Sequence, residues 1–357
     1  MITGLTIKDF RGIGWGRLDN LTPLVILVGP NGCGKSTVLD ALLLGASKDP
    51  QNQINVVLDR QEPIVRTNAQ GQVRSGSQTN KSWLFHKGSS KFSVIQVATE
   101  SRIPEGTSLL SAVSGRAVEP DRSVMVRTTQ LKPPNSREGN VVISFSNMAP
   151  LRDRSVALAD TISNGAFQPF PDISDIRLVD TAPQYRLETI EDLYSQATRQ
   201  GLNKDIKTQA LELLKNAENI EILTEGNQPV LHITYPNYSV PVVLAGEGIK
   251  LYLRQSLELA APPNTTILME EPEAHLNIRT MKFSAKALFA ATHRKIQIIL
   301  TTHSLEFIDE IISAATPEDL SNISLFRLKL NDGNLVTSHF SGTQTATARE
   351  LLQEDLR

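Results

Sequence analysis

The chain of 357 residues contains a single cysteine, Cys33, so it cannot form a disulfide within itself. A lone thiol is typical of proteins in a reducing compartment, and we therefore expect a cytoplasmic location. No run of about 18 apolar residues occurs, which argues against a membrane-spanning helix. The opening MITGLTIKDFRGIG also lacks the basic cluster and apolar stretch of a secretory leader, so we predict neither membrane insertion nor secretion.

An excess of charge of either sign is also missing. Lysine and arginine number 36 against 38 aspartate and glutamate, so the net charge of −2 gives no general affinity for polyanions. Residues 51–140 nevertheless hold 12 Lys and Arg against 7 Asp and Glu. Two interpretations of this local excess stay open, a solvated surface or a weak DNA-binding surface. With 40% hydrophobic residues, the chain can bury a core without disulfides or a structural metal.

Two segments near the N-terminus predict strands. Residues 2–8 alternate apolar and polar side chains, which is typical of a strand with one buried face. Residues 24–28, LVILV, are wholly apolar and stop at Gly29, as expected of a central strand buried on both faces. A helix is predicted from Lys35, because apolar residues then recur at helical spacing, and Gly45 is its expected end.

The middle of the chain changes character twice. Short alternating segments between about 55 and 147 predict an antiparallel β layer with long loops. Two amphipathic helices are expected between about 185 and 218, separated by Gly201, and a strand meander follows at 220–243. After residue 247 helices and strands alternate, which predicts parallel strands.

We therefore predict an α/β fold whose core is divided in sequence by an insertion. Residues 1–150 are expected to form the N-terminal half of the core with the antiparallel layer. Residues 151–235 are expected to form a partly helical insertion, and residues 236–357 the C-terminal half of the core. No fixed-period repeat or heptad array occurs, so a long coiled coil is not expected.

The segment GPNGCGKS, residues 29–36, fits the phosphate-binding pattern G-x-x-x-x-G-K-[ST] between a predicted strand and a predicted helix. Its glycines let backbone N–H groups approach phosphate oxygens, and the helix N-terminus adds the positive end of a dipole. We expect a solvent-facing Lys35 to contact the β- and γ-phosphates and Ser36 to place its hydroxyl on Mg²⁺. Cys33 is either a small filler or a redox-sensitive thiol. The nucleotide-binding residues expected here are Asn31, Gly32, Cys33, Gly34, Lys35, Ser36 and Thr37.

A second pattern places two carboxylates and a histidine after apolar strands. Residues 265–269, TTILM, run directly into Glu270 and Glu271, and the later strand KIQIIL runs into TTHS with His303. Phosphate hydrolysis needs one carboxylate to anchor Mg²⁺ and another to polarise the attacking water. A histidine there can donate a hydrogen bond to the γ-phosphate. We expect Glu270 to serve the metal, and Glu271, His303 and Lys35 to be catalytic.

The order GPNGCGKST, then EEPEAHL, then TTHS about 30 residues later resembles the ABC-type ATPase heads of the SMC, RecF and overcoming-lysogenization-defect (OLD) proteins. The segment LTIKDFRGIG is similar to their opening strand. The resemblance covers residues 1–48 and 240–312, and EEPEAHL resembles the OLD group and its single-head relatives in bacterial defence systems more than transporter subunits. It implies a P-loop mixed sheet with flanking helices, an antiparallel β layer and a partly helical insertion.

Further site residues are implied by this resemblance. Arg11 occupies the place of an arginine that contacts the nucleotide in the family. The segment LAGEG, residues 244–248, matches the family's signature loop, so Gly246 and Gly248 are expected to meet the nucleotide of a partner head, although the family's serine is missing. Gln96 is the candidate for the family's Mg²⁺-sensing glutamine. Other glutamines in range are Gln61, Gln70, Gln72 and Gln78.

The resemblance implies an ATPase that uses ATP and Mg²⁺, closes into a homodimer through its ATP sites and opens on hydrolysis. The residues after TTHS lack the acidic pattern of a TOPRIM nuclease. We therefore expect a separate effector protein, such as a nuclease or toxin, in genome or anti-phage defence.

One alternative is a RecF-like DNA-repair ATPase, supported by the excess of Lys and Arg over Asp and Glu in residues 51–140. A second is an ATP-dependent scaffold with little hydrolysis, and a transporter subunit is disfavoured because its Leu-Ser-Gly-Gly signature is missing.

Overall fold

The computed structural model describes residues 1–59, 65–67, 73–75, 84–86, 93–101, 123–131, 141–148, 175–179 and 188–357. Its strands are β1 (Ile2–Phe10), β2 (Ile13–Asp19), β3 (Leu24–Val28), β4 (Val65–Thr67), β5 (Val73–Ser75), β6 (Ser93–Ser101), β7 (Ser123–Leu131), β8 (Val141–Met148), β9 (Ile176–Val179), β10 (Asn219–Glu225), β11 (Gln228–Tyr235), β12 (Tyr238–Pro241), β13 (Thr266–Glu270), β14 (Gln297–Thr301), β15 (Ile323–Asn331) and β16 (Asn334–Ser341). Its α-helices are α1 (Lys35–Ala46), α2 (Pro50–Asp59), α4 (Ile190–Arg199), α5 (Asn203–Leu213), α6 (Glu247–Glu258), α7 (Ile278–His293), α8 (Leu305–Ala314), α9 (Pro317–Ser321) and α10 (Gly342–Ala346). A 3₁₀ turn (Val242–Leu244) and a π-helical turn (Thr347–Leu351) complete the described elements.

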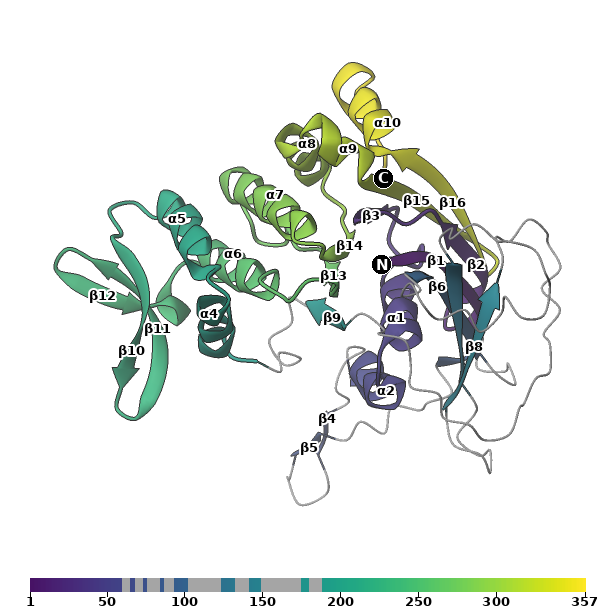
Figure 1. Ribbon diagram of the computed structural model, residues 1–357, viewed down its shortest axis with the longest axis horizontal. Helices are drawn as coiled ribbons and strands as arrows, with labels where there is room; N and C mark the ends of the chain where they lie inside the picture. The colour runs from purple at the N-terminus through teal and green to yellow at the C-terminus, as the bar shows by residue number, and fades with distance from the viewer. Residues whose placement is uncertain are drawn as a thin grey trace, which may run out of the picture.

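One large sheet forms the body of the molecule, in the order β8-β7-β6-β1-β2-β16-β15-β3-β14-β13-β9. The strands from β15 to β9 run parallel, and β1, β2, β6, β7 and β8 pair antiparallel. Figure 1 shows the antiparallel strands at one end of the molecule and the small sheet β10-β11-β12 at the other. The predicted α/β fold with an antiparallel layer is confirmed. Every helix among the described residues is too short or too polar to span a bilayer.

The central strand β3 is buried on both faces, as its unbroken apolar run predicts. Val25 and Leu27 belong to a core that includes the inner side of α1. Leu24 and Ile26 belong to a second core on the opposite face, where α7 and α8 lie. The sheet is therefore covered by helices on both faces at the strand that leads into the phosphate loop.

Helix α1 ends at Ala46, one residue after the end predicted at Gly45. Gly45 also allows α1 to pack closely against β6. A Cβ atom at this position would lie 2.7 Å from a methyl group of Ile95 and 2.7 Å from one of Val97, both on β6. The missing side chain lets α1 approach the antiparallel strands, so this glycine has a role in tertiary contact.

The predicted helices and meander after residue 185 form a third core. Leu193 of α4, Ile220 of β10 and Leu231 of β11 pack there against Tyr252 and other residues of α6. In this arrangement the phenol of Tyr194 donates a hydrogen bond to the carbonyl of Ile220 (2.8 Å). Helix α6 therefore packs in this third core and also lies in the part of the chain that carries the acidic motif.

The predicted division into residues 1–150, 151–235 and 236–357 remains a prediction. Strand β9 lies within the predicted insertion, yet it pairs in parallel with β13 at the edge of the main sheet. The hairpin β15–β16 extends the main sheet between β3 and β2, and we had no expectation for it. Its alternating residues and the turn at Asp332-Gly333 are nevertheless typical of a hairpin.

The tight contact between α1 and β6 predicts that Gly45→Ala lowers the free energy of unfolding by about 1 kcal/mol. Overpacking costs about 1–3 kcal/mol, whereas alanine gains about 1 kcal/mol over glycine in helix propensity. Chemical denaturation measures the difference. Gly248→Ala in α6 is the matched control and should lose no stability, because its Cβ would meet only a carbonyl oxygen at 3.4 Å. A Gly45→Ala protein as stable as the wild type would contradict the packing argument.

Candidate active site

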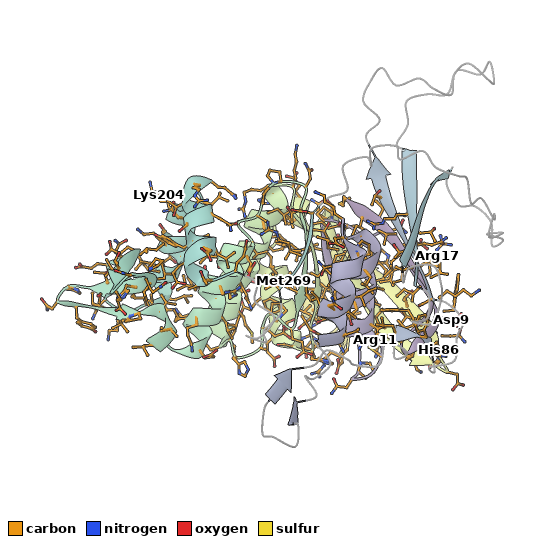
Figure 2. The ribbon with its side chains drawn as sticks, turned by 90° about the horizontal axis from the view of Figure 1, so that it is seen from below. Asp9, Arg11, Arg17, His86, Lys204 and Met269 are labelled. Atoms are coloured by element: carbon orange, nitrogen blue, oxygen red, sulfur yellow. The ribbon has the colours of Figure 1, made fainter. Side chains whose placement is uncertain are left out.

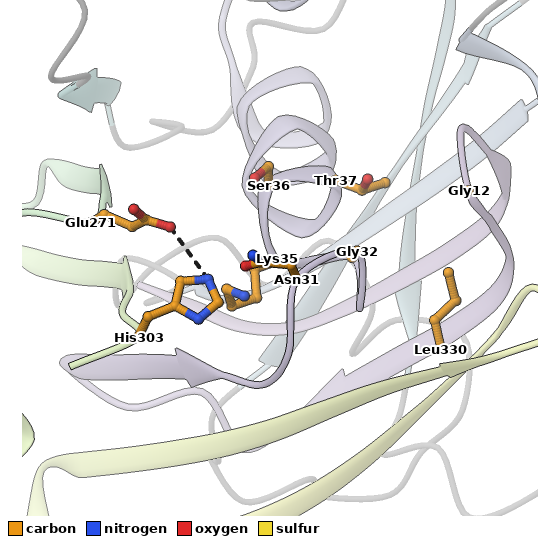
Figure 3. A pocket seen from close by; sticks show the side chains of 10 residues that line it. Gly12, Asn31, Gly32, Lys35, Ser36, Thr37, Glu271, His303 and Leu330 are labelled. Atoms are coloured by element: carbon orange, nitrogen blue, oxygen red, sulfur yellow. Dashed lines mark ion pairs between the residues drawn. The ribbon is translucent and has the colours of Figure 1, made fainter. Parts of the chain in front are cut away.

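The site lies where the parallel strands β3, β14 and β13 end. Leu27 of β3 pairs with Thr301 of β14, and Thr301 pairs with Glu270 of β13. Because the carboxyl ends of parallel strands meet at one edge of a sheet, the loops that follow them converge. They line a pocket of about 320 Å³, shown in Figure 3, formed by Gly12, Asn31, Gly32, Gly34, Lys35, Ser36, Thr37, Glu271, His303 and Leu330.

The phosphate loop requires its glycines for two different reasons. Gly29, Gly32 and Gly34 adopt φ angles of 141°, 77° and 101°, which side chains disfavour. A Cβ on Gly29 would also lie 2.5 Å from the carbonyl oxygen of Leu328. Helix α1 begins after Gly34, and among the described residues no side chain caps its first turn. Its first N–H groups are therefore available to an anionic ligand.

Lys35 is buried, contrary to the expectation that it faces solvent. Only 7% of the residue is exposed, because its ammonium donates to the carbonyl oxygens of Gly29 (2.9 Å) and Pro30 (3.2 Å) within the loop. Burial lowers the pKa of Lys35, and the nearby Cys33, Glu271 and Glu273 oppose that shift. The thiol of Cys33 is free and also buried, and its sulfur lies 4.0 Å from the ammonium nitrogen.

Glu270 and Glu271 take different positions at the end of β13. Glu270 ends the strand and accepts a hydrogen bond from the hydroxyl of Ser36. Glu271 adopts a φ of 44°, and its N–H donates to the carbonyl oxygen of Thr301 (3.1 Å). This left-handed turn breaks the alternation of the strand, so both carboxylates can face the pocket side of the sheet edge.

His303 lies beside Glu271 on the same side of the pocket, and a dashed line in Figure 3 joins the two side chains. The imidazole Nε2 lies 3.4 Å from Oε1 of Glu271. The pKa of His303 is lowered, first by burial and then by the positive charge of Lys35, while Glu271 opposes the shift. Burial and the Lys35 ammonium therefore both disfavour the charged imidazolium at this position. Lys35, Ser36, Glu270, Glu271 and His303 are brought together as predicted.

Three residues near this site were not singled out by sequence reasoning. Gly12 and Leu330 line the pocket opposite Glu271 and come from the β1–β2 turn and from β15. Glu273 is buried, and its Oε1 accepts hydrogen bonds from the hydroxyl of Thr302 (2.5 Å) and the N–H of His303 (3.2 Å). Burial raises the pKa of Glu273. The only sequence cue for Glu273 is that it is the third acid of EEPE.

Arg11 is adjacent to the pocket but does not line it. Its guanidinium forms an ion pair with the carboxylate of Asp40 in α1. Its carbonyl oxygen lies 3.1 Å from Nδ1 of His86, and Figure 2 shows these two residues at the same end of the molecule. The structure therefore places Arg11 where it braces the turn that carries Gly12, and a contact with nucleotide remains a prediction.

Gln96 is not brought to the pocket. It lies within β6, where Ile95 and Val97 on either side face α1. Strand alternation therefore turns Gln96 to the opposite face, where its amide donates to the hydroxyl of Thr128 (3.2 Å). The other four glutamines considered for the Mg²⁺-sensing position lie outside the described residues.

Gly246 and Gly248 lie at the start of α6 and are not among the residues that line the pocket of their own chain. Val243, just before this loop, and Leu244, its first residue, are 68% and 73% exposed. Glu247 in the first turn of α6 forms an ion pair with Lys250 (2.5 Å). The signature-like loop is thus an exposed surface feature of the single chain.

The oxygen atoms near the phosphate loop fit a hard divalent cation. The Ser36 hydroxyl and the Glu270 carboxylate touch beside the pocket. Magnesium bound with nucleotide commonly takes only one or two protein oxygens and completes its shell with phosphate and water. Among the described residues no group of three or more His, Cys, Asp or Glu side chains forms a cage for a metal. The donor set therefore fits Mg²⁺ bound together with a nucleotide.

Comparison with known proteins adds family evidence to this geometry. Residues 4–228 match the sequence model of a family described as "AAA domain". Residues 181–309 match a second model, described as "AAA domain, putative AbiEii toxin, Type IV TA system". Over 368 aligned residues the chain is 23% identical to a protein named "ATP/GTP phosphatase" from Helicobacter pylori, with 96% of each chain covered.

Solved structures show a similar fold. An SMC head bound to the C-terminal winged-helix domain of ScpA aligns with a TM-score of 0.52 at 16% identity, covering 95% of this chain and 98% of the other. An SMC head from Pyrococcus furiosus, bound to the C-terminal domain of ScpA, aligns with a TM-score of 0.54 at 15% identity, covering 99% of each chain. Because the first family model spans well over half of the sequence, the chain belongs to the AAA-domain family, and it is an ATPase with the fold of an SMC- and RecF-like ABC head.

Proposed function

We propose that the chain binds ATP with Mg²⁺ in this pocket and alternates between an ATP-closed homodimer and an open state that controls a separate effector protein. The observation that carries the proposal is the pairing of Glu271 with His303 (3.4 Å) beside the phosphate loop. A carboxylate and an imidazole beside a phosphate loop are groups that can assist the attack of water on a γ-phosphate.

The phosphate loop would hold the triphosphate through its backbone N–H groups and the start of α1. The Lys35 ammonium, now bonded to the carbonyls of Gly29 and Pro30, would exchange these contacts for phosphate oxygens. Ser36 and Glu270 would hold Mg²⁺. When bound, Mg²⁺ neutralises charge on the phosphates and so favours their attack by water.

In the hydrolysis step Glu271 would accept a proton from water while the water oxygen bonds to the γ-phosphorus. The bond from the γ-phosphorus to the bridging oxygen breaks, and ADP and phosphate leave. His303 would donate a hydrogen bond to the γ-phosphate. Burial and the Lys35 ammonium lower the pKa of His303, which disfavours a second positive charge beside that ammonium.

Dimer closure is supported by the position of the signature-like loop. Gly246 caps the N-terminus of α6 close to the exposed Val243 and Leu244, and it does not line the pocket of its own chain. A helix N-terminus there could meet the phosphates of a second head. Glu247 weakens this interaction unless Lys250 neutralises it, and the missing serine keeps open the alternative of a scaffold with little hydrolysis.

A role in genome or anti-phage defence is supported by the second family description, which refers to a toxin and a toxin–antitoxin system. We propose that the ATPase gates such an effector, a nuclease or toxin carried by another chain, in the cytoplasm. The alternative of direct DNA binding rests on the excess of Lys and Arg over Asp and Glu in residues 51–140. Most residues of this range lie outside the described residues.

We expect Lys35→Ala to weaken ATP binding by about 10- to 100-fold. A charge-assisted hydrogen bond contributes about 1.5–3 kcal/mol, and each 1.4 kcal/mol corresponds to a factor of ten. Isothermal titration calorimetry measures the affinity. Lys48→Ala, just beyond the other end of α1 and 59% exposed, is the matched control and should bind ATP normally. Equal affinities for the two variants would remove Lys35 from the site.

Glu271→Gln should lower the rate of ATP hydrolysis by about 10² to 10⁴, because the amide cannot accept the proton of the attacking water. ATP binding should persist, since Lys35 and Ser36 are unchanged. Light scattering with ATP and Mg²⁺ should then show an accumulated dimer. Loss of turnover without a dimer would retain the general base and reject the dimer switch. Unchanged turnover would reject the role of Glu271.

The His303 imidazole should titrate below its ordinary pKa of 6.5, and Lys35→Ala should move that pKa upward. Burial disfavours the imidazolium, and removing the ammonium removes the second cause of the shift. NMR titration of the histidine ring protons measures both values. The Lys48→Ala protein should titrate like the wild type. A wild-type pKa above 6.5 would contradict the lowering of the His303 pKa by burial and Lys35.

A further inference from the structure

Glu273 links the two turns that carry the proposed catalytic groups. It follows the acidic pair after β13, and its Oε1 accepts from the Thr302 hydroxyl at 2.5 Å and from the His303 N–H at 3.2 Å. Both donors lie in the turn after β14, about thirty residues further along the chain. One carboxylate oxygen therefore joins the turn of Glu271 to the turn of His303.

Thr302 has hydrogen bonds to β3, to Ser304 and to the same carboxylate. The Thr302 N–H donates to the carbonyl of Leu27 (3.1 Å), and its hydroxyl accepts from the N–H of Ser304 (3.0 Å). Thr302 is fully buried, so its hydroxyl proton needs an acceptor inside the protein, and Glu273 provides it. The position of the His303 backbone thus depends on Glu273 Oε1.

The other oxygen of Glu273 shows that stability alone does not account for this residue. Oε2 is buried and has no hydrogen-bond partner among the described residues, and only 7% of the residue is exposed. Burying a carboxylate with one oxygen unpaired costs free energy. The cost of burying this carboxylate suggests a role other than stability.

We propose that Glu273 is a positioning residue for ATP hydrolysis, which holds the His303 turn at the distance from Glu271 that the reaction needs. This inference rests on the proposed roles of Glu271 and His303. Glu273 does not line the pocket, so it acts through the Thr302 hydroxyl and the His303 N–H and not on the nucleotide. A displacement of about 1 Å in a reacting group can cost on the order of 100-fold in rate.

Two substitutions separate position from charge. Glu273→Gln keeps an acceptor oxygen on a side chain of the same length. Glu273→Asp keeps the negative charge on a side chain that is shorter by one methylene. We expect Glu273→Gln to retain kcat within about threefold and Glu273→Asp to lower kcat by about 10- to 100-fold. The affinity for ATP should be unchanged in both, because the phosphate loop is intact. The reverse ranking, with Asp active and Gln inactive, would overturn the proposal in favour of a charge-based role.

A double-mutant cycle tests whether Glu273 acts through the histidine. In a His303→Ala background there is no imidazole to position, so adding Glu273→Asp should not lower kcat further. If the two losses multiply instead, Glu273 acts independently of His303 and the inference fails while the proposed function stands. If His303→Ala alone leaves kcat unchanged, the proposed function has failed at His303, and the inference fails with it.

Thr302→Val provides a test that does not depend on the folding of the Glu273 variants. It removes the hydroxyl donor at nearly constant volume and leaves the His303 N–H bonded to Glu273. We expect kcat to fall by about 3- to 10-fold with ATP affinity unchanged, a smaller loss than for Glu273→Asp. Thermal unfolding is followed in parallel, and kcat is measured well below the melting temperature of every variant. A Thr302→Val protein with wild-type kcat would contradict the proposed path.

Discussion

The parallel pairing of β3, β14 and β13 is the constraint on which the active site depends. Backbone hydrogen bonds continue this pairing one residue past the strands, from the N–H of Thr302 to Leu27 and from the N–H of Glu271 to Thr301. The three loops therefore leave the sheet at the same level. A slip of one residue in this register would turn the carboxylates and the histidine to the other face.

Buried polar contacts hold the acidic turn from a second direction. The amide of Gln255 in α6 donates to the carbonyl of Pro272 (2.5 Å) and accepts from the hydroxyl of Ser284 in α7 (3.3 Å). The same helix begins at the signature-like loop and packs Tyr252 into the third core. One helix thus contacts the acidic turn after β13, the exposed loop and the core formed by α4 and the small sheet.

Local sequence patterns can have more than one physical cause, and three positions show this. A glycine in the last turn of a helix is typical of a helix end, and Gly45 also lets α1 approach Ile95 and Val97. Side chains alternate between the two faces of β6, so Gln96 points away from the face of Ile95 and Val97, but the sequence does not say which face lies near the pocket. A lysine in a phosphate loop was expected to face solvent, but Lys35 is folded back onto carbonyls of its own loop.

The sequence by itself determined the phosphate loop, the central strand and the places of Glu270, Glu271 and His303 along the chain. These depend on local chemistry, namely glycines at positive φ and apolar strands that end in polar residues. Only the tertiary structure decided that Gly12 and Leu330 share a pocket, and that Glu273 holds the His303 turn. Those contacts depend on strand order and register across distant segments, which short-range residue patterns do not encode.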